Sequence, residues 1–527
     1  MQRYVYGIHI VDLITLVIFQ AVIVYFGFRA HRQVHSMGDY IIGRRRFGKL
    51  FMIMHAFGTG THTDQAVIVA GQTYAHGLSG IWAQWLWLFC TPFYWLIAPI
   101  FRRMRYLTTA DYFRERFHGS MEVAFVVMGV LVLTVDMGVM LLGQGKIIHS
   151  VTGGQVPIAT AIFIMVALFL FYGVSGGLIA AIVTDFIQGF FIVVMSFVMI
   201  PIALVKVGGF SGLHAKIDAL NLDVDMFSLA SSGKYTLFYI AMIALNALVN
   251  IVAQPHTMGN CAAGKTEYEG RVGFCFGTFI KRVCTVWWAF TGLFAVILYP
   301  KIADHPELAF GTCVQELLPL GLTGLMLASM MAAMMSSCDS LMIAMSALFT
   351  QNVYQRYLVK DRDQGHYLLV IRIVSVFAVV FGLAWAFYFR DLFHGLELFW
   401  KLSALIGISF WLGLLWRRTN RYGAWAAFLV ASIVFIGTSK DWGWIPLPPY
   451  TDGALAFWPF TVGSAAAWSY VFYLAAGFLA GIVVTLITPP EPAEKIQKFF
   501  TLISTPVGRE DELRAKGIEI QHEGDRH

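Results

Sequence analysis

Charge is scarce in this sequence. Only 13% of its 527 residues are Asp, Glu, Lys or Arg, whereas 58% are hydrophobic and 15% are aromatic. The mean hydropathy is +0.68. A water-soluble fold of this size cannot bury that much apolar surface in its core. The composition therefore excludes an ordinary soluble domain and predicts a polytopic membrane protein.

The motifs of common enzyme classes are also missing. The six cysteines form no CxxC pair and show no metal-ligand spacing with histidine. No strand is predicted before the GKT at 264–266, as a phosphate loop would need. We therefore expect that the protein is not an enzyme, and no basic stripe interleaved with aromatics indicates nucleic-acid binding.

Hydrophobic windows long enough to cross a bilayer recur along the whole chain. A bilayer core of about 30 Å needs roughly 20 apolar residues per helix. The windows predict about thirteen membrane helices and hence an all-α fold. The first window lacks the basic region and cleavage site of a signal peptide, so we expect it to be retained. The predicted spans are 8–28, 50–72, 80–101, 123–148, 157–174, 178–205, 236–259, 272–299, 320–350, 369–389, 395–416, 422–438 and 464–487.

The distribution of basic residues predicts the orientation of the helices. With the N-terminus outside, the loops on the inner side carry 19 Lys and Arg residues and the outer side carries 7. This bias follows the positive-inside rule, and it accounts for the net charge of +6. We expect a multi-pass protein of the inner (plasma) membrane, with its N-terminus outside and its C-terminus in the cytoplasm.

One predicted membrane helix contains an unusually polar stretch, FGTGTHTDQAVIVAG at 57–71. Gly58 and Gly60 predict an unwound turn, which a membrane helix tolerates only where it lines a cavity or is buried by protein. Close packing of helices by small residues is the alternative. His62 and Asp64 favour a functional site, because ionisable groups at membrane depth are costly and mark pathways.

A second interrupted helix contains NIVAQPHTMGN at 250–260. Each interruption opens a set of five predicted helices, and an odd number per set gives the two sets opposite orientations. Paired broken helices in two inverted halves are typical of secondary transporters with a site at the midplane. The predicted segments are an N-terminal helix and basic loop at 1–49, a first inverted repeat at 50–206, a second at 236–416, two additional helices at 417–488, and a polar tail at 489–527 that is partly helical or disordered.

A third polar group lies in ASMMAAMMSSCDS at 328–340. At 100° per residue, Ser336, Asp339 and Ser340 share one helix face, while Ser337 is turned about 100° from Ser336. Serines that bond back to the preceding turn are the alternative explanation. A carboxylate among methionines in the middle of a helix needs a cation, a proton or a partner, so Asp339 favours a site.

Two stretches resemble a known family. YGVSGGLIAAIVTDFIQGF at 172–190 is similar to the G-G-L-x-A-V-x-x-T-D-x-x-Q signature of the sodium:solute symporters, which include proline, glucose and sialic acid transporters. LTTADYFRERF at 107–117 resembles that family's loop after the second core helix. The resemblance covers roughly residues 8–440. It implies a LeuT-like core of 5+5 helices in an inverted repeat.

The resemblance also implies a sodium site between the first and eighth core helices. In the family, carbonyls of the broken first helix combine with a carbonyl and two hydroxyls of the eighth. Carried over to this sequence, the carbonyls are those of Gly58, Thr61 and Ala333, and the hydroxyls are those of Ser336 and Ser337. The chemistry is suitable, because a small hard cation prefers oxygen ligands and an unwound helix releases carbonyls.

Some family members have a second cation site that uses the aspartate of the fifth core helix and two hydroxyl residues of the eighth. The matching residues here are Asp185, Asp339 and Ser340. An aspartate at 339 replaces the usual serine or threonine. We expect the two carboxylates to bind a second cation or to share a proton, unless Asp185 only bonds neighbouring hydroxyls.

The clues to the solute conflict. Asp64 and Gln65 fall where sugar-transporting relatives have an acid and an amide, whereas QPH at 254–256 resembles the proline permease branch. That branch has an arginine where this chain has Asn260. The candidate solute-binding residues are His62, Asp64, Gln65, Asn250, Gln254, His256 and Lys281. Further charged residues are predicted in gates, in the site or in structural ion pairs: Asp136, Lys146, Arg282, Glu397 and Lys401.

Together these features predict a sodium-coupled symporter that imports a small polar organic solute, such as a sugar, an amino acid or a carboxylate, by alternating access. The expected partners are that solute, sodium ions (Na+) and the lipid bilayer, and the pattern indicates no particular oligomeric state. Proton-coupled transport and a transporter-like membrane sensor are the alternatives. A membrane-embedded enzyme would need a metal cluster or a nucleophile with its base, and neither is visible.

Overall fold

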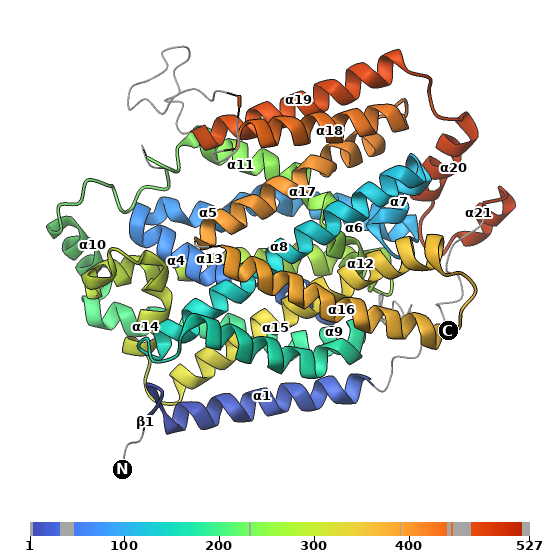
Figure 1. Cartoon of the computed structure of the whole chain (residues 1–527). Coiled ribbons are helices and arrows are strands. Elements are labelled where there is room, and N and C mark those ends of the chain that lie inside the picture. The colour runs from blue at the N-terminus through green and yellow to red at the C-terminus, as the bar shows by residue number, and fades with distance from the viewer. Residues whose placement is uncertain are drawn as a thin grey trace, which may run out of the picture.

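The computed structural model is a bundle of helices (Figure 1), and it describes residues 4–31, 47–230, 233–389, 391–439, 444–445 and 465–518. A short hairpin, β1 (Tyr4–Val5) and β2 (Ile8–His9), precedes the first helix. The first helices are α1 (Ile10–His31), α3 (Lys49–Gly60), α4 (Thr63–His76), η2 (Gly77–Ile81), α5 (Trp82–Trp85), η3 (Leu86–Cys90), α6 (Thr91–Met104), α7 (Thr109–Arg116), α8 (Gly119–Val151), α9 (Ile158–Val207) and α10 (Gly209–Ala219).

The second part of the chain continues the bundle. In Figure 1, α1 lies along one edge, and α18 and α19 lie along the opposite edge. The remaining helices are α11 (Leu237–Asn250), η4 (Ile251–Ala253), α12 (Pro255–Ala262), α13 (Glu267–Leu298), η5 (Pro300–Ile302), η6 (Pro306–Leu308), α14 (Ala309–Leu317), α15 (Leu322–Phe349), η7 (Thr350–Leu358, a π-helix), α16 (Gln364–Tyr388), α17 (Leu392–Leu415), α18 (Arg421–Gly437), α19 (Ala465–Ile487), α20 (Ala493–Ser504) and α21 (Glu510–Ala515).

The first predicted interruption exists, but it is displaced from the two glycines. Gly58 and Gly60 both lie inside α3, so the expectation that they form the unwound turn was wrong. The extended residues are Thr61 (φ −120°, ψ 108°) and His62 (φ −113°, ψ 159°), between α3 and α4. Gly58 instead allows α3 to pack closely against α9, because a Cβ at this position would lie 3.1 Å from the Cβ of Asp185 on α9.

The second predicted interruption is confirmed. The chain from α11 and η4 bends by 66° into α12, and Gln254 is the extended residue at the bend. Pro255 is the first residue of α12. A proline is tolerated there, because the first N–H groups of a helix have no acceptor within the helix. GNCAAGKT at 259–266 has the residue spacing of a phosphate loop. Its first glycine lies in α12 rather than in a loop after a strand, so this segment does not cradle a phosphate.

Among the described residues, eight helices are long and apolar enough to cross a membrane, or nine if the bent pair is one span. Three shorter apolar helices cover Ile10–Phe26, Ile158–Leu168 and Arg421–Gly437. The count of thirteen stays a prediction. The stretches predicted at 157–174 and 178–205 fall within α9, whose 50 residues would extend about 75 Å if straight.

The two ends of α9 nevertheless lie at the same end of the bundle. Its start follows closely on the end of α8, where Ser150 donates to the carbonyl of Leu308 (3.3 Å). Near its other end, Lys206 donates to the carbonyl of Glu316 (3.2 Å). Both acceptors border α14, which is only about 14 Å long. The chain therefore reverses direction within α9, as two antiparallel spans require.

The LTTADYFRERF stretch forms a buried polar network at the opposite end of the bundle. Thr108 and Asp111 make a capping box at the start of α7. The Asp111 carboxylate also accepts from Asn352 (2.9 Å) and Arg356 (3.1 Å) of η7, and Arg356 and Asn352 both donate to Glu122 of α8. The network explains why this stretch is polar, because it joins α7 and α8 to the end of α15.

The tail predicted as partly helical or disordered is ordered where the structure describes it. α20 and α21 pack against the loop between α6 and α7, where Arg105 has a left-handed conformation (φ +58°). The Arg105 guanidinium donates to the carbonyls of Thr505 (3.3 Å) and Pro506 (3.0 Å) and to the carboxylate of Glu510 (3.3 Å). One buried arginine thus anchors the tail.

Arg105→Ala is expected to release this tail while leaving the membrane helices folded. Charge-assisted hydrogen bonds contribute about 1.5–3 kcal/mol each, so the loss of several should raise the open population of the tail at least tenfold. Limited proteolysis of the purified protein would detect this as faster cleavage after residue 490. Arg509→Ala is the matched control, since its pair with Glu512 is largely exposed. Equal cleavage of both variants and the wild type would contradict the anchoring role.

Candidate functional site

The break between α3 and α4 exposes backbone carbonyls in the centre of the bundle. The Gly60 carbonyl accepts from the Gln65 side-chain amide (3.2 Å) and from the Lys281 ammonium of α13. A cation at the C-terminal end of a helix is favourable, because the last carbonyls carry partial negative charge. Side chains of α4 and α13 therefore bind the carbonyl at the end of α3.

The serine pair of α15 faces this break. Ser337 donates to the carbonyls of Gly58 and Thr59, at 3.3 Å each. Ser336 donates to the carboxylate of Asp185 on α9. The structure thus brings Gly58, Ser336 and Ser337 together, as predicted from the sequence. The other two predicted ligands are buried close by, Thr61 at the break and Ala333 one helical turn before Ser337.

Asp185 is fully buried and has partners on two helices. Its second carboxylate oxygen lies 2.6 Å from Nδ1 of His55 on α3. Thr59 bonds to that histidine (3.3 Å) and to Ser340 of α15 (3.2 Å). His55 was missed in the sequence, although it lies three and four residues before Gly58 and Thr59 and hence on the same helix face.

The predicted second-site residues are partly brought together. Ser340 joins the Asp185 group through Thr59, and Asp339 is buried beside Ser340 on α15. Asp339 lies about 60° around the helix from Ser336 and hence on the same face of α15. Its role as a cation ligand stays a prediction.

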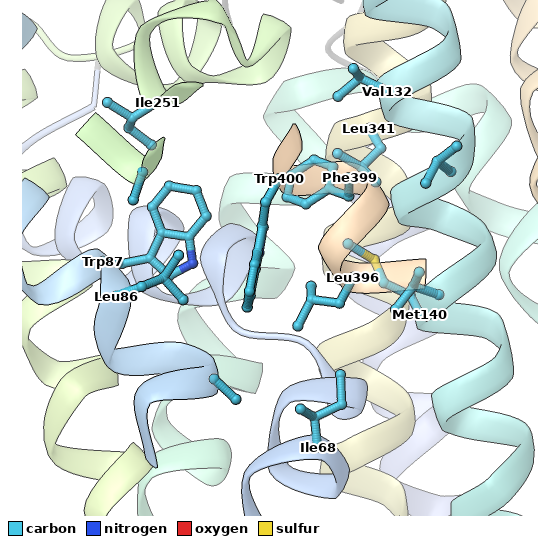
Figure 2. Close-up of a cluster of buried hydrophobic side chains, with 14 of the residues drawn as sticks. Ile68, Leu86, Trp87, Val132, Met140, Ile251, Leu341, Leu396, Phe399 and Trp400 are labelled. Atoms are coloured by element: carbon cyan, nitrogen blue, oxygen red, sulfur yellow. The ribbon is translucent and has the colours of Figure 1, made fainter. Parts of the chain in front are cut away.

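A cavity of about 70 Å³ lies next to the break. It is enclosed by α3, η3, α8, α13 and α17 together with the second broken helix. Figure 2 shows two of its aromatic walls, Trp87 and Trp400, facing each other. The lining residues are Ala56, Thr59, Gly60, His62, Gln65, Gln84, Trp87, Tyr94, Asp136, Ile251, Gln254, His256, Asn260, Phe274, Thr278, Lys281, Arg282, Leu396, Phe399 and Trp400.

Most of the predicted solute-binding residues line this cavity. They are His62, Gln65, Gln254, His256 and Lys281. Two others lie behind its wall: Asn250 donates to the carbonyl of Trp400 (3.2 Å), and Asp64 is fully buried 3.6 Å from Nδ1 of His62. The aromatic residues were missed, because apolar side chains are not distinctive in a membrane helix.

The further charged residues separate into two groups. Asp136 and Arg282 line the cavity. Lys146 pairs with Glu307 (3.3 Å), and Lys401 pairs with Glu397 (3.7 Å). The second group therefore consists of ion pairs outside the cavity lining.

Sequence comparison places this chain among transporters. A model of the sodium:solute symporter family matches residues 40–431. An osmoregulated proline transporter from Bacillus subtilis is 25% identical over 80% of this chain and 87% of its own length. The sodium/glucose cotransporter of Vibrio parahaemolyticus is 24% identical over 82% of this chain and 86% of its own length. The sodium/proline symporter of Escherichia coli is 23% identical over 82% and 89%.

Solved structures show the same fold. A Na+-coupled sialic acid symporter in a substrate-bound outward-open state superposes with a TM-score of 0.77 at 16% identity, over 91% of this chain and 98% of that one. Mhp1, a nucleobase-cation-symport-1 family transporter in a closed conformation, superposes with a TM-score of 0.56 at 11% identity, over 88% and 98%. The predicted LeuT-like architecture is therefore confirmed.

Proposed function

Because the chain belongs to the sodium:solute symporter family, and is thus a multi-pass, sodium-coupled membrane transporter, we propose that it imports a small polar organic solute through the cavity beside the α3–α4 break. The break, the serine pair and the cavity support this proposal, since backbone and hydroxyl oxygens lie next to a cavity there. Gly60 belongs to both the break and the cavity, because it is the last residue of α3 and lines the cavity.

The main sodium site in this proposal consists of the carbonyls of Gly58, Thr61 and Ala333 and the hydroxyls of Ser336 and Ser337. The observation that carries it is the contact of Ser337 with the carbonyls of Gly58 and Thr59. The Ser337 hydroxyl of α15 thus meets the carbonyls of the last turn of α3. A hard cation is bound by such a set of neutral oxygens, which replace its water shell.

Asp185, Asp339 and Ser340 form the proposed second site, for a cation or for a proton. The proton form is favoured, because His55 and Ser336 each engage one carboxylate oxygen of Asp185. Both carboxylate oxygens of Asp185 thus have a hydrogen-bond partner without a second ion. We accordingly expect one sodium ion per solute.

The same proposal gives the protein two inverted repeats, at 50–206 and 236–416. Each begins with a broken helix, and motion of one set against the other would open the cavity to alternate sides. The bias of Lys and Arg supports an inner (plasma) membrane protein with its N-terminus outside and its tail in the cytoplasm.

Ser337→Ala and Ser336→Ala are each expected to raise the sodium concentration for half-maximal uptake about tenfold. Loss of one oxygen ligand should weaken sodium binding, while the small neighbours on α15 tolerate the change. The measurement is uptake into proteoliposomes with and without a sodium gradient. Ser329→Ala is the matched control, because Ser329 lies on the same helix and donates only to Leu325 one turn earlier (2.8 Å). Unchanged sodium dependence in both test variants would refute the site.

A further inference from the structure

Two buried cations on α13 line the cavity. Lys281 and Arg282 are 6% and 4% exposed. Lys281 donates to the Gly60 carbonyl, and Arg282 Nη1 donates to the Gln84 carbonyl (2.8 Å). Among the described residues, no carboxylate oxygen lies within 4 Å of either cation, and Arg282 Nε has no acceptor. A buried cation without an ion-pair partner is costly, so this wall is suited to an anionic group of the solute.

Buried carboxylates also lie at the cavity. Asp136 of α8 is part of the lining, and in the described part of the chain its Oδ1 accepts no hydrogen bond. Asp64 lies behind it, and neither of its oxygens accepts a hydrogen bond from a described residue. Asp136 is within electrostatic range of Asp64, His62 and Lys281. The cavity lining therefore combines two buried cations of α13 with the buried Asp136 of α8, and Asp64 of α4 lies behind the lining.

The remaining lining combines aromatic side chains with polar ones, such as the amides of Gln84 and Gln254. Trp87 and Trp400 face each other (Figure 2), and Phe399 lies next to Trp400. Trp400 Nε1 is a buried donor with no acceptor among the described residues. A volume of about 70 Å³ corresponds to about five to seven water molecules, at roughly 10–15 Å³ each by this measure. The space fits a compact solute with one apolar part and two charged ends.

We propose, on the basis of the symporter function above, that the solute is a small zwitterion such as an amino or imino acid. Its carboxylate binds Arg282, with Lys281 nearby, and its ammonium group binds Asp136. A planar guanidinium matches a carboxylate better than a point charge does. The hydroxyls of a sugar would bring no counter-charge to Arg282, and a plain carboxylate would bring none to Asp136.

The test uses probes that differ in one charged group on the same ring. L-proline has both groups, pyrrolidine lacks the carboxylate, and cyclopentanecarboxylate lacks the amine; L-alanine and D-glucose complete the set. Thermal unfolding of the purified protein is followed in sodium buffer. We expect L-proline or L-alanine to raise the melting temperature, and each one-charge analogue and glucose to require at least tenfold higher concentrations. Equal responses to an analogue or to glucose, or no response to either amino acid, would overturn the inference.

Variants assign the two ends of the solute. Arg282→Gln should weaken the response to the amino acid at least tenfold, and Arg282→Lys should restore part of it. Asp136→Asn should instead reduce the preference for L-proline over cyclopentanecarboxylate, a change that a merely structural role would not produce. Lys146→Gln is the control, since Lys146 pairs with Glu307 outside the cavity lining. An unchanged preference in Asp136→Asn, or equal losses in Arg282→Gln and Lys146→Gln, would refute the assignment.

The sodium response separates this inference from the proposed function. Sodium alone should stabilise the wild type and Arg282→Gln equally, because Arg282 is not among the proposed sodium ligands. A wild type that responds to sodium but not to either amino acid would overturn only the inference that the solute is a zwitterion. A wild type that sodium does not stabilise would refute the proposed sodium coupling itself.

Discussion

Gly58→Ala is expected to abolish most transport, whereas Gly60→Ala should leave it nearly unchanged. A Cβ at position 58 would lie 3.1 Å from the Cβ of Asp185 and 3.3 Å from Oγ of Ser336. Such contacts are tighter than ordinary van der Waals contacts, so α3 would have to shift by a few tenths of an ångström from α9 and α15 at the proposed sodium site. At position 60 a Cβ would meet no atom within 4 Å. Both residues lie in the same helix, so the two variants form a matched pair.

The measurement is uptake per molecule in the membrane, together with the sodium concentration for half-maximal uptake. Alanine is about 1 kcal/mol more favourable than glycine inside a helix, so a stability loss should not hide the effect at Gly60. Normal sodium-dependent uptake by Gly58→Ala would mean that α3, α9 and α15 need not approach this closely.

The position of the helix break illustrates what the sequence can predict. Its polar composition located the interruption to within a few residues, because glycine and ionisable residues are rare in a membrane helix. It did not identify Thr61 and His62 as the extended residues. The carbonyl at the end of α3 is held by Lys281, more than 200 residues later, and such a distant partner leaves no local pattern.

The candidate site divides in the same way. Ser336 and Ser337 could be predicted, because they are adjacent polar residues in an apolar helix and match a family pattern. Trp87 and Trp400 could not, since aromatic residues are common throughout this chain. They belong to η3 and α17, and only the folded bundle makes them opposite walls of one cavity (Figure 2).

His55 shows why a neighbouring residue can still be missed. It lies within one turn of Gly58, and its spacing placed it on the face of Thr59. No local pattern indicates that His55 pairs with Asp185, which lies 130 positions later. That pairing changes the expectation for the second site, because the carboxylate already has a hydrogen-bond partner on α3 as well as Ser336.

Asp185→Asn is expected to raise the sodium concentration for half-maximal uptake at least tenfold, with a hyperbolic dependence in both the variant and the wild type. Asparagine keeps the shape of the side chain but weakens its charge-assisted bonds to His55 and Ser336. Ser336 then has a weaker, neutral acceptor to orient it beside Gly58 and Ser337. The measurement is initial uptake against sodium concentration at constant ionic strength.

Asp12→Asn is the matched control for this change. Asp12 is also buried, but its carboxylate accepts from the backbone N–H groups of Gly321 and Gly324 at the start of α15 (2.7 and 2.9 Å). Its loss should lower the melting temperature through the weakened cap without changing the sodium dependence. A sigmoidal wild type whose Hill coefficient falls toward one in Asp185→Asn would show that a second sodium ion binds at Asp185, because only a bound ion, and not the hydrogen bond to His55, makes uptake cooperative in sodium.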